Sequence, residues 1–358
     1  MDMAKKGSLP LVEVSGKPFE MGKMTGKKCS ARAATYKKSI SANIEYSTGY
    51  DWKRAVERSK LYFPHAEEFY PDYIEEIRGY AEGAKQPFEE MFALCCHELL
   101  FAEAFRGCTD VAVNGDMTDD GRVLAAHNED WSDEVLETVV FLHAKPKGKP
   151  EFFCTAYAGL FPSCGMNSAG ISLTGNALSQ NDMRVGIPKS FPVRKAFEAK
   201  RIGEALSDAM PANRASSYNN IVSDKHGEIY SLEGSATDCA YLYAIDGYLV
   251  HTNHYTADWM QKYELDPSSV ATSVFRYNRA LRLIEGQLGG VTVDSLASIL
   301  RDHINKPGSI CRHPNPGVNR YDTSETVFSI IYDLTNLEAH VCKGHPCTGT
   351  YVKHSLRG

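Results

Sequence analysis

The spacing of apolar residues divides the chain into a helical first part and a strand-rich second part. Leu11–Val14 predicts a short opening strand. After it, apolar side chains recur every three or four residues, so that Tyr70, Ile74 and Ile77 share one face of a helix. The segment Pro87–Phe105 repeats this pattern. The first hundred residues are therefore expected to form a helical layer.

From Cys108 onward, short alternating runs separated by turns predict β-strands. The turn Asp119-Asp120-Gly121 predicts a hairpin between strands at 111–113 and 123–125, and Asp246-Gly247 predicts one between 239–245 and 248–251. Further strands are expected at 137–144, 152–157, 170–174, 220–223, 229–232, 327–332 and 337–342. Two helices are expected between 188 and 210, and two more at 273–285 and 292–301, the last capped by Thr292.

This order of elements predicts a single α+β domain. The antiparallel strands are too numerous for one small sheet, and the helices fall in separate groups. Two stacked antiparallel sheets between helical layers, an αββα sandwich, account for both observations. No repeat, low-complexity tract or linker divides the chain.

Composition narrows the class of protein. The 358 residues are 43% hydrophobic and 23% charged with a net charge of −6, which argues against a nucleic-acid partner. The apolar runs are too short for a membrane span, and no apolar signal core follows the first residues. The ten cysteines are scattered, as is typical of reduced thiols, so a cytoplasmic location is expected.

The cysteine and histidine spacings do not form a recognisable zinc motif. Cys95-Cys96 and Cys342-x4-Cys347 have the wrong spacing, and His251-x-x-His254 has no obvious third ligand nearby in sequence. No metal and no cofactor are therefore expected.

The dipeptide Gly107-Cys108 is the strongest chemical signal in the chain. It follows a helix-like segment that ends at Arg106 and opens a strand-like one. If the bond between the two residues were cut, Cys108 would carry a free α-amine beside its thiol, and thus a nucleophile and a base in one residue.

Four segments in this order resemble the acyl-coenzyme A:6-aminopenicillanic acid acyltransferase family of self-processing N-terminal-nucleophile hydrolases. They are Gly107-Cys108-Thr109, Asn128-Glu129-Asp130-Trp131, Asn167-Ser168-Ala169-Gly170 and His251-Thr252-Asn253-His254. The resemblance implies the four-layer αββα fold. It also implies cleavage between Gly107 and Cys108 into an α segment, 1–107, and a β segment, 108–358, which stay associated as one domain.

The resemblance also implies roles for individual residues. Cys108 would be the nucleophile in both processing and turnover, and the side-chain amide of Asn253 would donate to the oxyanion. Asp130 would orient the amine. Supporting positions would be Thr109, Glu233 and Ser235, and Arg194 would bind a substrate carboxylate or form a helix salt bridge.

One position departs from the family. Where its penicillin-forming members carry a Ser-Arg pair, this chain has Asp322-Thr323, which implies a site without that cation. Asp322 and Glu325, if they line the site, would suit a cationic amine or a β-alanyl group.

We therefore expect hydrolysis of a small N-acyl amide through a Cys108 thioester, with β-alanyl amines among the substrates that family members use. Acyl-coenzyme A-dependent acyl transfer of the penicillin type is an alternative. Two others are an uncut cysteine hydrolase with His127 or His254 as its base, and a non-catalytic binding protein.

Overall fold

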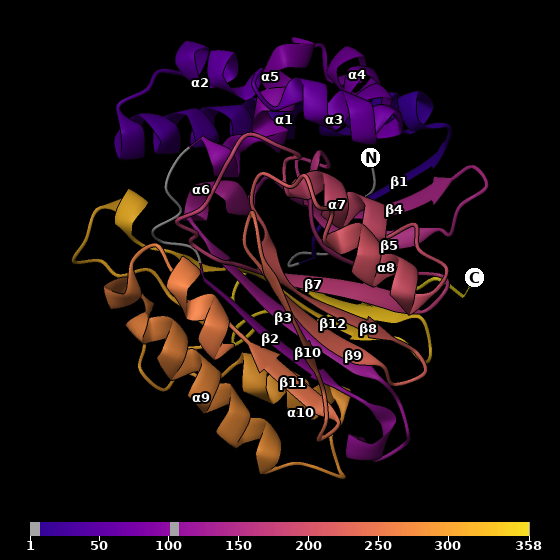
Figure 1. Cartoon of the computed structure of the whole chain (residues 1–358). Coiled ribbons are helices and arrows are strands. Elements are labelled where there is room, and N and C mark those ends of the chain that lie inside the picture. Colours follow the sequence, from indigo (N-terminus) through magenta and orange to yellow (C-terminus); the bar gives the residue numbers. More distant parts are fainter. Residues whose placement is uncertain (1–7, 101–106, 358) are drawn as a thin grey trace.

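Two β-sheets lie face to face with helices on both outer faces in the computed structural model, which describes residues 8–100 and 107–357 (Figure 1). The eight-stranded sheet has the order β1-β4-β5-β6-β7-β8-β9-β10, and the six-stranded sheet has the order β11-β2-β3-β12-β13-β14. β1 pairs parallel with β4, and the other pairings between described strands are antiparallel. The four-layer α+β sandwich is thus confirmed.

The strands of the eight-stranded sheet are β1 Leu11–Gly16, β4 Val139–Pro146, β5 Phe152–Tyr157, β6 Phe161–Asn167, β7 Ile171–Ala177, β8 Tyr218–Asp224, β9 Ile229–Gly234 and β10 Cys239–Tyr243. Those of the six-stranded sheet are β2 Gly107–Val113, β3 Leu124–Trp131, β11 Tyr248–His251, β12 Glu325–Asp333, β13 Glu338–Lys343 and β14 Val352–Ser355.

The helices are α1 Pro18–Thr48, α2 Trp52–Ser59, α3 Phe63–Phe69, α4 Pro71–Ala84, α5 Phe88–Cys95, α6 Asp133–Leu136, α7 Ser190–Ala196, α8 Ile202–Ala209, α9 Ala271–Glu285 and α10 Val293–Leu300. Short 3-10 helices are η1 His97–Leu99, η2 Gly115–Met117, η3 Asp258–Tyr263, η4 Pro267–Val270 and η5 Arg320–Asp322. Thr292 caps α10 as expected, because its hydroxyl accepts from the amide of Ser295. The expected helix over Pro87–Phe105 ends earlier, at α5 and η1, and its residues 101–106 lie outside the described part of the chain.

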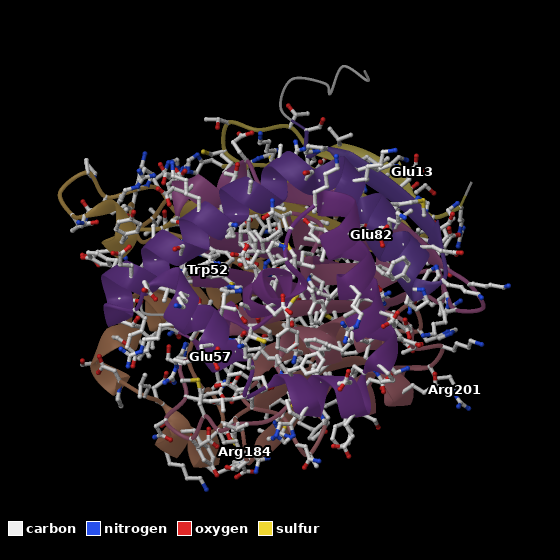
Figure 2. The ribbon with its side chains drawn as sticks, turned by 90° about the horizontal axis from the view of Figure 1, so that it is seen from above. Glu13, Trp52, Glu57, Glu82, Arg184 and Arg201 are labelled. Atoms are coloured by element: carbon white, nitrogen blue, oxygen red, sulfur yellow. The ribbon has the colours of Figure 1, made fainter. Side chains whose placement is uncertain are left out.

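Helices from the first hundred residues cover the eight-stranded sheet, together with α7 and α8, whereas α9 and α10 cover the six-stranded sheet (Figure 1). Seen from above, charged side chains such as Glu57 and Glu82 lie on the outer side of the N-terminal helices (Figure 2). Among the described residues, we find no helix with the length and apolar character of a membrane span.

The hairpin predicted around Asp246-Gly247 is wrong. β10 pairs with β9 at the edge of one sheet, while β11 pairs with β2 at the edge of the other. The turn therefore carries the chain from one sheet to the next. Ala244 just before it is buried in a cluster between the sheets, with Ala112 and Ala125 of the facing strands. The hairpin of β2 and β3 is confirmed.

α1 and α4 approach closely because glycines remove side chains from their contact. A Cβ built on Gly26 would lie 2.1 Å from the carbonyl oxygen of Tyr80 on α4. Replacement by alanine must therefore push two backbones apart. We expect Gly26→Ala to lower the free energy of unfolding by about 1–3 kcal/mol, measured by urea denaturation. Gly203→Ala on α8, where a Cβ meets nothing within 4 Å, is the matched control and should not destabilise the protein.

Candidate active site

Cys108 is buried at the start of β2, between β11 and β3 in the six-stranded sheet. In the β2–β3 register, Cys108 is opposite Glu129 and Gly107 is opposite Asp130. The predicted nucleophile and the predicted carboxylate are thus brought to neighbouring strands by ordinary antiparallel pairing. Arg106, which precedes them in the sequence, lies outside the described residues.

Asn253, two residues beyond β11, contacts the backbone of Cys108. The backbone N–H of Cys108 donates to Asn253 Oδ1 at 2.8 Å. Asn253 Nδ2 donates one N–H to the carbonyl oxygen of Ala177 at 3.0 Å. Its second N–H has no acceptor among the described residues, and an amide nitrogen carries two donors. Asn253 therefore holds the Cys108 nitrogen and keeps one donor available.

Arg276 on α9 is a site residue that the sequence analysis did not find. Its Nη2 donates to Asn253 Oδ1 at 2.8 Å, and its Nη1 donates to the Cys108 carbonyl oxygen and, at 3.1 Å, to Thr109 Oγ1. Burial, followed by the neighbouring Arg312 cation, lowers the pKa of Arg276 to about 10. The helical spacing of Arg276 could have indicated its burial, because it lies on the same face of α9 as the buried residues Ala280 and Ile284.

Asp130 and Arg312 lie against Gly107. A Cβ on Gly107 would stand 2.7 Å from Asp130 Oδ2 and 3.2 Å from Arg312 Nη1, so only glycine fits without displacement. Asp130 Oδ1 accepts from Thr326 Oγ1 at 2.7 Å, while Oδ2 has no hydrogen-bond donor among the described residues and lies 3.9 Å from Arg312 Nε. Burial raises the pKa of Asp130 above its ordinary value. The Arg312 cation, and after it Arg276, lower this pKa but do not outweigh the effect of burial.

His127 on β3 is held between two carboxylates. Its Nδ1 lies 2.5 Å from Asp110 Oδ1, and its Nε2 lies 3.0 Å from Glu129 Oε2. Burial lowers the pKa of His127, but Asp110 and the other nearby acidic groups outweigh it and raise the pKa well above the ordinary value. Both ring nitrogens are therefore engaged by carboxylate oxygens, which leaves no free ring nitrogen to accept a proton from the Cys108 thiol.

The Cys108 thiol needs a base to become a nucleophile. Burial, and after it the Glu129 carboxylate, raises the pKa of Cys108 above the ordinary thiol value. His254, the other candidate histidine, has its pKa lowered to about 4 by burial and by His251, and its Nδ1 lies 2.8 Å from Ser273 Oγ. Neither histidine is hydrogen-bonded to the thiol among the described contacts.

Two cavities lie near Cys108, and Ala177 lines both. The first, here called the nucleophile cavity, is the smaller one and is lined by Cys108, Glu98, Glu129, Trp131, Phe161 and Tyr218. The second, called the arginine cavity, is larger and is lined by Asn253, Arg276, Arg312, His313 and Asp322.

Asp322 and Thr323, the pair that departs from the family pattern, line the arginine cavity. Two guanidinium groups from other positions, those of Arg276 and Arg312, line the same cavity. Asp322 faces this cavity, and its Oδ2 accepts from the hydroxyl of Tyr46 at 2.8 Å. Arg276 comes from α9 and Arg312 from the loop before β12, and no local sequence pattern connects either of them with the Asp322-Thr323 pair.

The three supporting residues have different surroundings. Thr109 contacts Arg276, as described above. Glu233 accepts from His251 and from the amides of Thr256 and Ala257, and although burial opposes it, the His251 contact and these hydrogen bonds lower the pKa of Glu233 to about 2. It thus fixes the segment that carries Asn253. The Ser235 hydroxyl donates to Asp182 at 2.8 Å, away from Cys108.

Two predicted substrate-binding residues are already paired within the protein. Arg194 donates to Glu76 at 2.9 Å and to Glu198 at 3.1 Å, and it lines a separate cavity between the N-terminal helices and α7. Of the two roles expected for Arg194, the structure therefore shows the salt bridge. Glu325 lies 3.1 Å from His345 Nε2 and does not line either cavity near Cys108.

The fold and this site together define a class: a four-layer α+β protein with a buried cysteine at the start of a central strand. Residues 117–347, more than half of the chain, match the model of the family described as acyl-coenzyme A:6-aminopenicillanic acid acyl-transferase. The chain is 31% identical over 284 residues to a protein of Emericella nidulans named acyl-coenzyme A:6-aminopenicillanic-acid-acyltransferase 40 kDa form, covering 77% of this chain and 76% of that one. The protein belongs to this acyltransferase family.

Other similarities are weaker. The chain is 29% identical over 192 residues to a Drosophila melanogaster protein named beta-alanyl-dopamine/carcinine hydrolase, covering 46% of this chain and 48% of that one. Among solved structures, penicillin V acylase from Agrobacterium tumefaciens matches with a TM-score of 0.49 and 12% identity, over 70% of this chain and 86% of that chain. The family match begins after Cys108, so the role of that residue is argued from its geometry.

Proposed function

We propose that the protein is a self-processing cysteine hydrolase of small N-acyl amides, with Cys108 as its amino-terminal nucleophile. The observation that carries this proposal is the contact set of Gly107-Cys108. Gly107 is enclosed by Asp130 and Arg312, and the Cys108 nitrogen is held by Asn253. In processing, the Cys108 thiol attacks the Gly107 carbonyl carbon, the peptide nitrogen leaves as the α-amine, and water hydrolyses the resulting thioester.

The freed α-amine supplies the base that the buried thiol requires. An α-amine has an ordinary pKa of about 7.7–8.0, so a useful fraction is neutral near neutral pH. His127, with both ring nitrogens engaged by carboxylates, does not fill this role, and Nδ1 of His254 is hydrogen-bonded to Ser273 Oγ. This comparison favours a cut chain over an uncut hydrolase with a histidine base. In turnover, the amine accepts the thiol proton and Asn253 donates its remaining N–H to the oxyanion.

After cleavage, segments 1–107 and 108–358 would remain one domain. β1 from the first segment pairs over its whole length with β4 from the second. The main apolar core also contains residues of both: Tyr36 stacks on Tyr157, and the hydroxyl of Tyr80 donates to the carbonyl oxygen of Ala158. Because separation would break a strand pair and expose this core, we expect the two pieces to copurify as a heterodimer.

The nucleophile cavity suits a short acyl group that carries an ammonium. Its Glu129 carboxylate and its Glu98 carboxylate, the latter 3.2 Å from Lys189 Nζ, lie among aromatic rings, including those of Trp131 and Tyr218, and aromatic faces attract cations. Glu129 accepts from Ser163 at 2.7 Å as well as from His127, which fixes its position. A β-alanyl group on the Cys108 sulfur would place its ammonium in this cavity. In this proposal, Glu98 and Glu129 surround the acyl group, while Asp322 lines the arginine cavity.

The arginine cavity supports a second candidate function. Arg276, Arg312 and Lys306 line it and would attract a carboxylate or phosphate group. Acyl transfer from an acyl-coenzyme A thioester to an amine is therefore the alternative to hydrolysis, with the same Cys108 thioester as its intermediate.

A parallel assay separates these functions. Purified protein is given β-alanyl-dopamine, β-alanyl-histamine, the matching propionyl amides, a penicillin, and an acyl-coenzyme A with 6-aminopenicillanic acid. Release of the amine from the β-alanyl compounds in preference to the uncharged propionyl ones supports the proposal. Turnover of the thioester pair without amide hydrolysis supports the transferase instead.

The charge of Arg276 should set the acidic limb of the pH–rate profile. Its Nη2 and the Cys108 nitrogen share one acceptor, each at 2.8 Å, so its positive charge disfavours protonation of the neighbouring amine. Since the neutral amine is the base, kcat/KM rises as pH rises through the pKa of the amine. In Arg276→Gln, that pKa rises, and the acidic limb should move to higher pH by about one unit. Arg276→Lys keeps the charge and should keep the limb. An unmoved limb in the glutamine variant would contradict this role of the arginine.

A further inference from the structure

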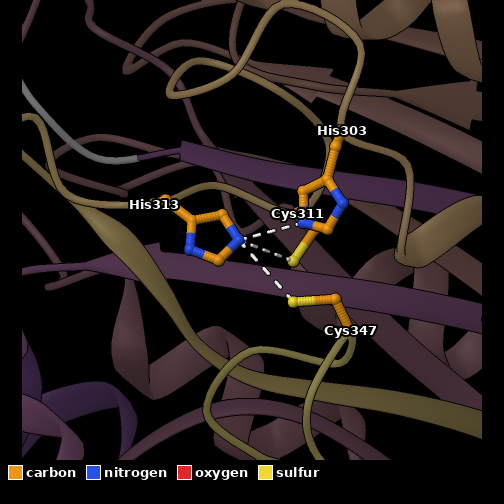
Figure 3. A group of neighbouring side chains, drawn as sticks. All are labelled: His303, Cys311, His313 and Cys347. Atoms are coloured by element: carbon orange, nitrogen blue, oxygen red, sulfur yellow. Dashed lines mark hydrogen bonds between the residues drawn. The ribbon is translucent and has the colours of Figure 1, made fainter.

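Four possible metal-ligand groups converge beside the arginine cavity, which one of them, His313, also lines. They come from the loop between α10 and β12 and from the loop after β13: His303, Cys311, His313 and Cys347. Figure 3 shows the two imidazole rings and the two thiols pointing toward one another. One ligand atom from each residue lies within 4.8 Å of all the others.

The two nitrogen–sulfur distances match the edges of a tetrahedral zinc site, and the nitrogen–nitrogen distance is about 0.3 Å shorter than such an edge. His313 Nε2 is 3.0 Å from His303 Nε2, 3.7 Å from Cys311 Sγ and 3.6 Å from Cys347 Sγ. Bonds of about 2.0–2.1 Å from zinc to nitrogen and about 2.3 Å from zinc to sulfur give edges of about 3.3–3.8 Å in a regular tetrahedron. We propose that these four side chains bind one structural Zn²⁺ ion as a Cys2His2 site.

The loops hold these side chains together through their backbones. The Cys311 amide donates to the Asp302 carbonyl oxygen at 3.0 Å, and the His313 amide donates to the Pro307 carbonyl oxygen at 3.2 Å. Arg301 Nε donates to the Pro346 carbonyl oxygen at 2.9 Å, which places Cys347 beside the first loop. The four positions are therefore fixed by contacts that do not involve the thiols or rings.

Two thiolates and two imidazoles favour zinc over the harder calcium and magnesium ions. Binding releases the two thiol protons to solvent, since the thiolate is the ligand form. With four protein ligands, the coordination is complete without water, which is the pattern of a structural site.

The proposed zinc site lies next to the wall of the arginine cavity. Arg312 lies between two ligands, Cys311 and His313, and the residues Pro307 and Gly308 of the same loop line the arginine cavity. The ion would therefore tie down the wall of this cavity and keep Arg312 beside Gly107 and Asp130. This consequence, unlike the metal binding itself, rests on the proposed function.

The test measures metal rather than activity. The full-length protein is purified without chelator, and its zinc content is measured by inductively coupled plasma mass spectrometry. It is then stripped with a chelator under reducing conditions and titrated with Co²⁺, whose thiolate bands report cysteine ligation. We expect about one zinc ion per chain in the purified protein. In the stripped protein, we expect cobalt–thiolate bands to appear as Co²⁺ is added.

Variants identify the ligands. Cys347→Ser and His303→Gln should lose the stoichiometric ion, whereas Cys239→Ser, a thiol outside the cluster, should keep it. Chelation should lower the Tm of the wild-type protein and leave that of Cys347→Ser unchanged. Wild-type protein that takes up neither Zn²⁺ nor Co²⁺ would overturn the proposal, as would a Cys311–Cys347 disulfide in freshly purified protein. If the ion is bound but amide turnover is absent, the metal site stands and the proposed function fails.

Discussion

Cys108→Ala should remain a single chain near 39.6 kDa and should lose amide turnover by a factor on the order of 10⁴–10⁶. Both effects have the same cause, because the sulfur is the attacking atom in processing and in catalysis. Cys108 is buried, and alanine fits its site with little loss of packing, so the variant should fold. Gel electrophoresis and intact mass report the first effect, and the β-alanyl amide assay reports the second.

Two controls make this result specific. Cys108→Ser retains a weaker nucleophile and should process slowly, over a time course that gel electrophoresis can follow. Cys239→Ser alters another cysteine, outside both cavities near Cys108, and should process and turn over substrate like the wild type. If Cys108→Ala kept full turnover, the thioester mechanism would be lost. If the protein bound these amides without turning them over in any form, the non-catalytic alternative would be favoured.

Asn253→Ala should lower kcat by about 10²–10³-fold, the usual effect of removing one oxyanion donor. The change also removes the acceptor shared by the Cys108 nitrogen and Arg276, so processing should slow as well. Because the donor acts mainly in the transition state, KM should change little. The measurement is steady-state kinetics on the processed fraction.

A matched asparagine tests whether this loss is local. Asn278→Ala alters an exposed residue on α9 whose side chain donates only to the carbonyl oxygen of Val274 in its own helix. Its kinetics should equal those of the wild type. Loss of stability in Asn253→Ala with an unchanged kcat would indicate that the residue only supports the loop.

The sequence predicted the architecture well because the spacing of apolar residues shows which face of each helix or strand is buried. The β2–β3 hairpin followed from its turn residues, and it brings Cys108 and Gly107 opposite Glu129 and Asp130. The prediction of a hairpin over 239–251 was wrong for a physical reason. Asp246-Gly247 reverses the chain as expected, but turn chemistry does not say whether the two strands extend the same sheet or two facing sheets.

The parts of the site that the sequence missed come from distant positions. Arg276 and Arg312 reach the arginine cavity from α9 and from the loop before β12, and no local pattern connects them with Asn253. The proposed zinc ligands were hidden in the same way, because His303 and Cys347 meet only through tertiary packing. Residue spacing along the chain predicts no metal, because it does not identify ligands that only the fold brings together.

The intact mass and amino-terminal sequence of freshly purified wild-type protein test the central claim most directly. The account predicts two associated polypeptides whose masses add up to the full chain plus one water, the second beginning at Cys108. A single uncut chain that hydrolyses amides at a steady rate would contradict it, because the thiol would then be working without its own amine as base.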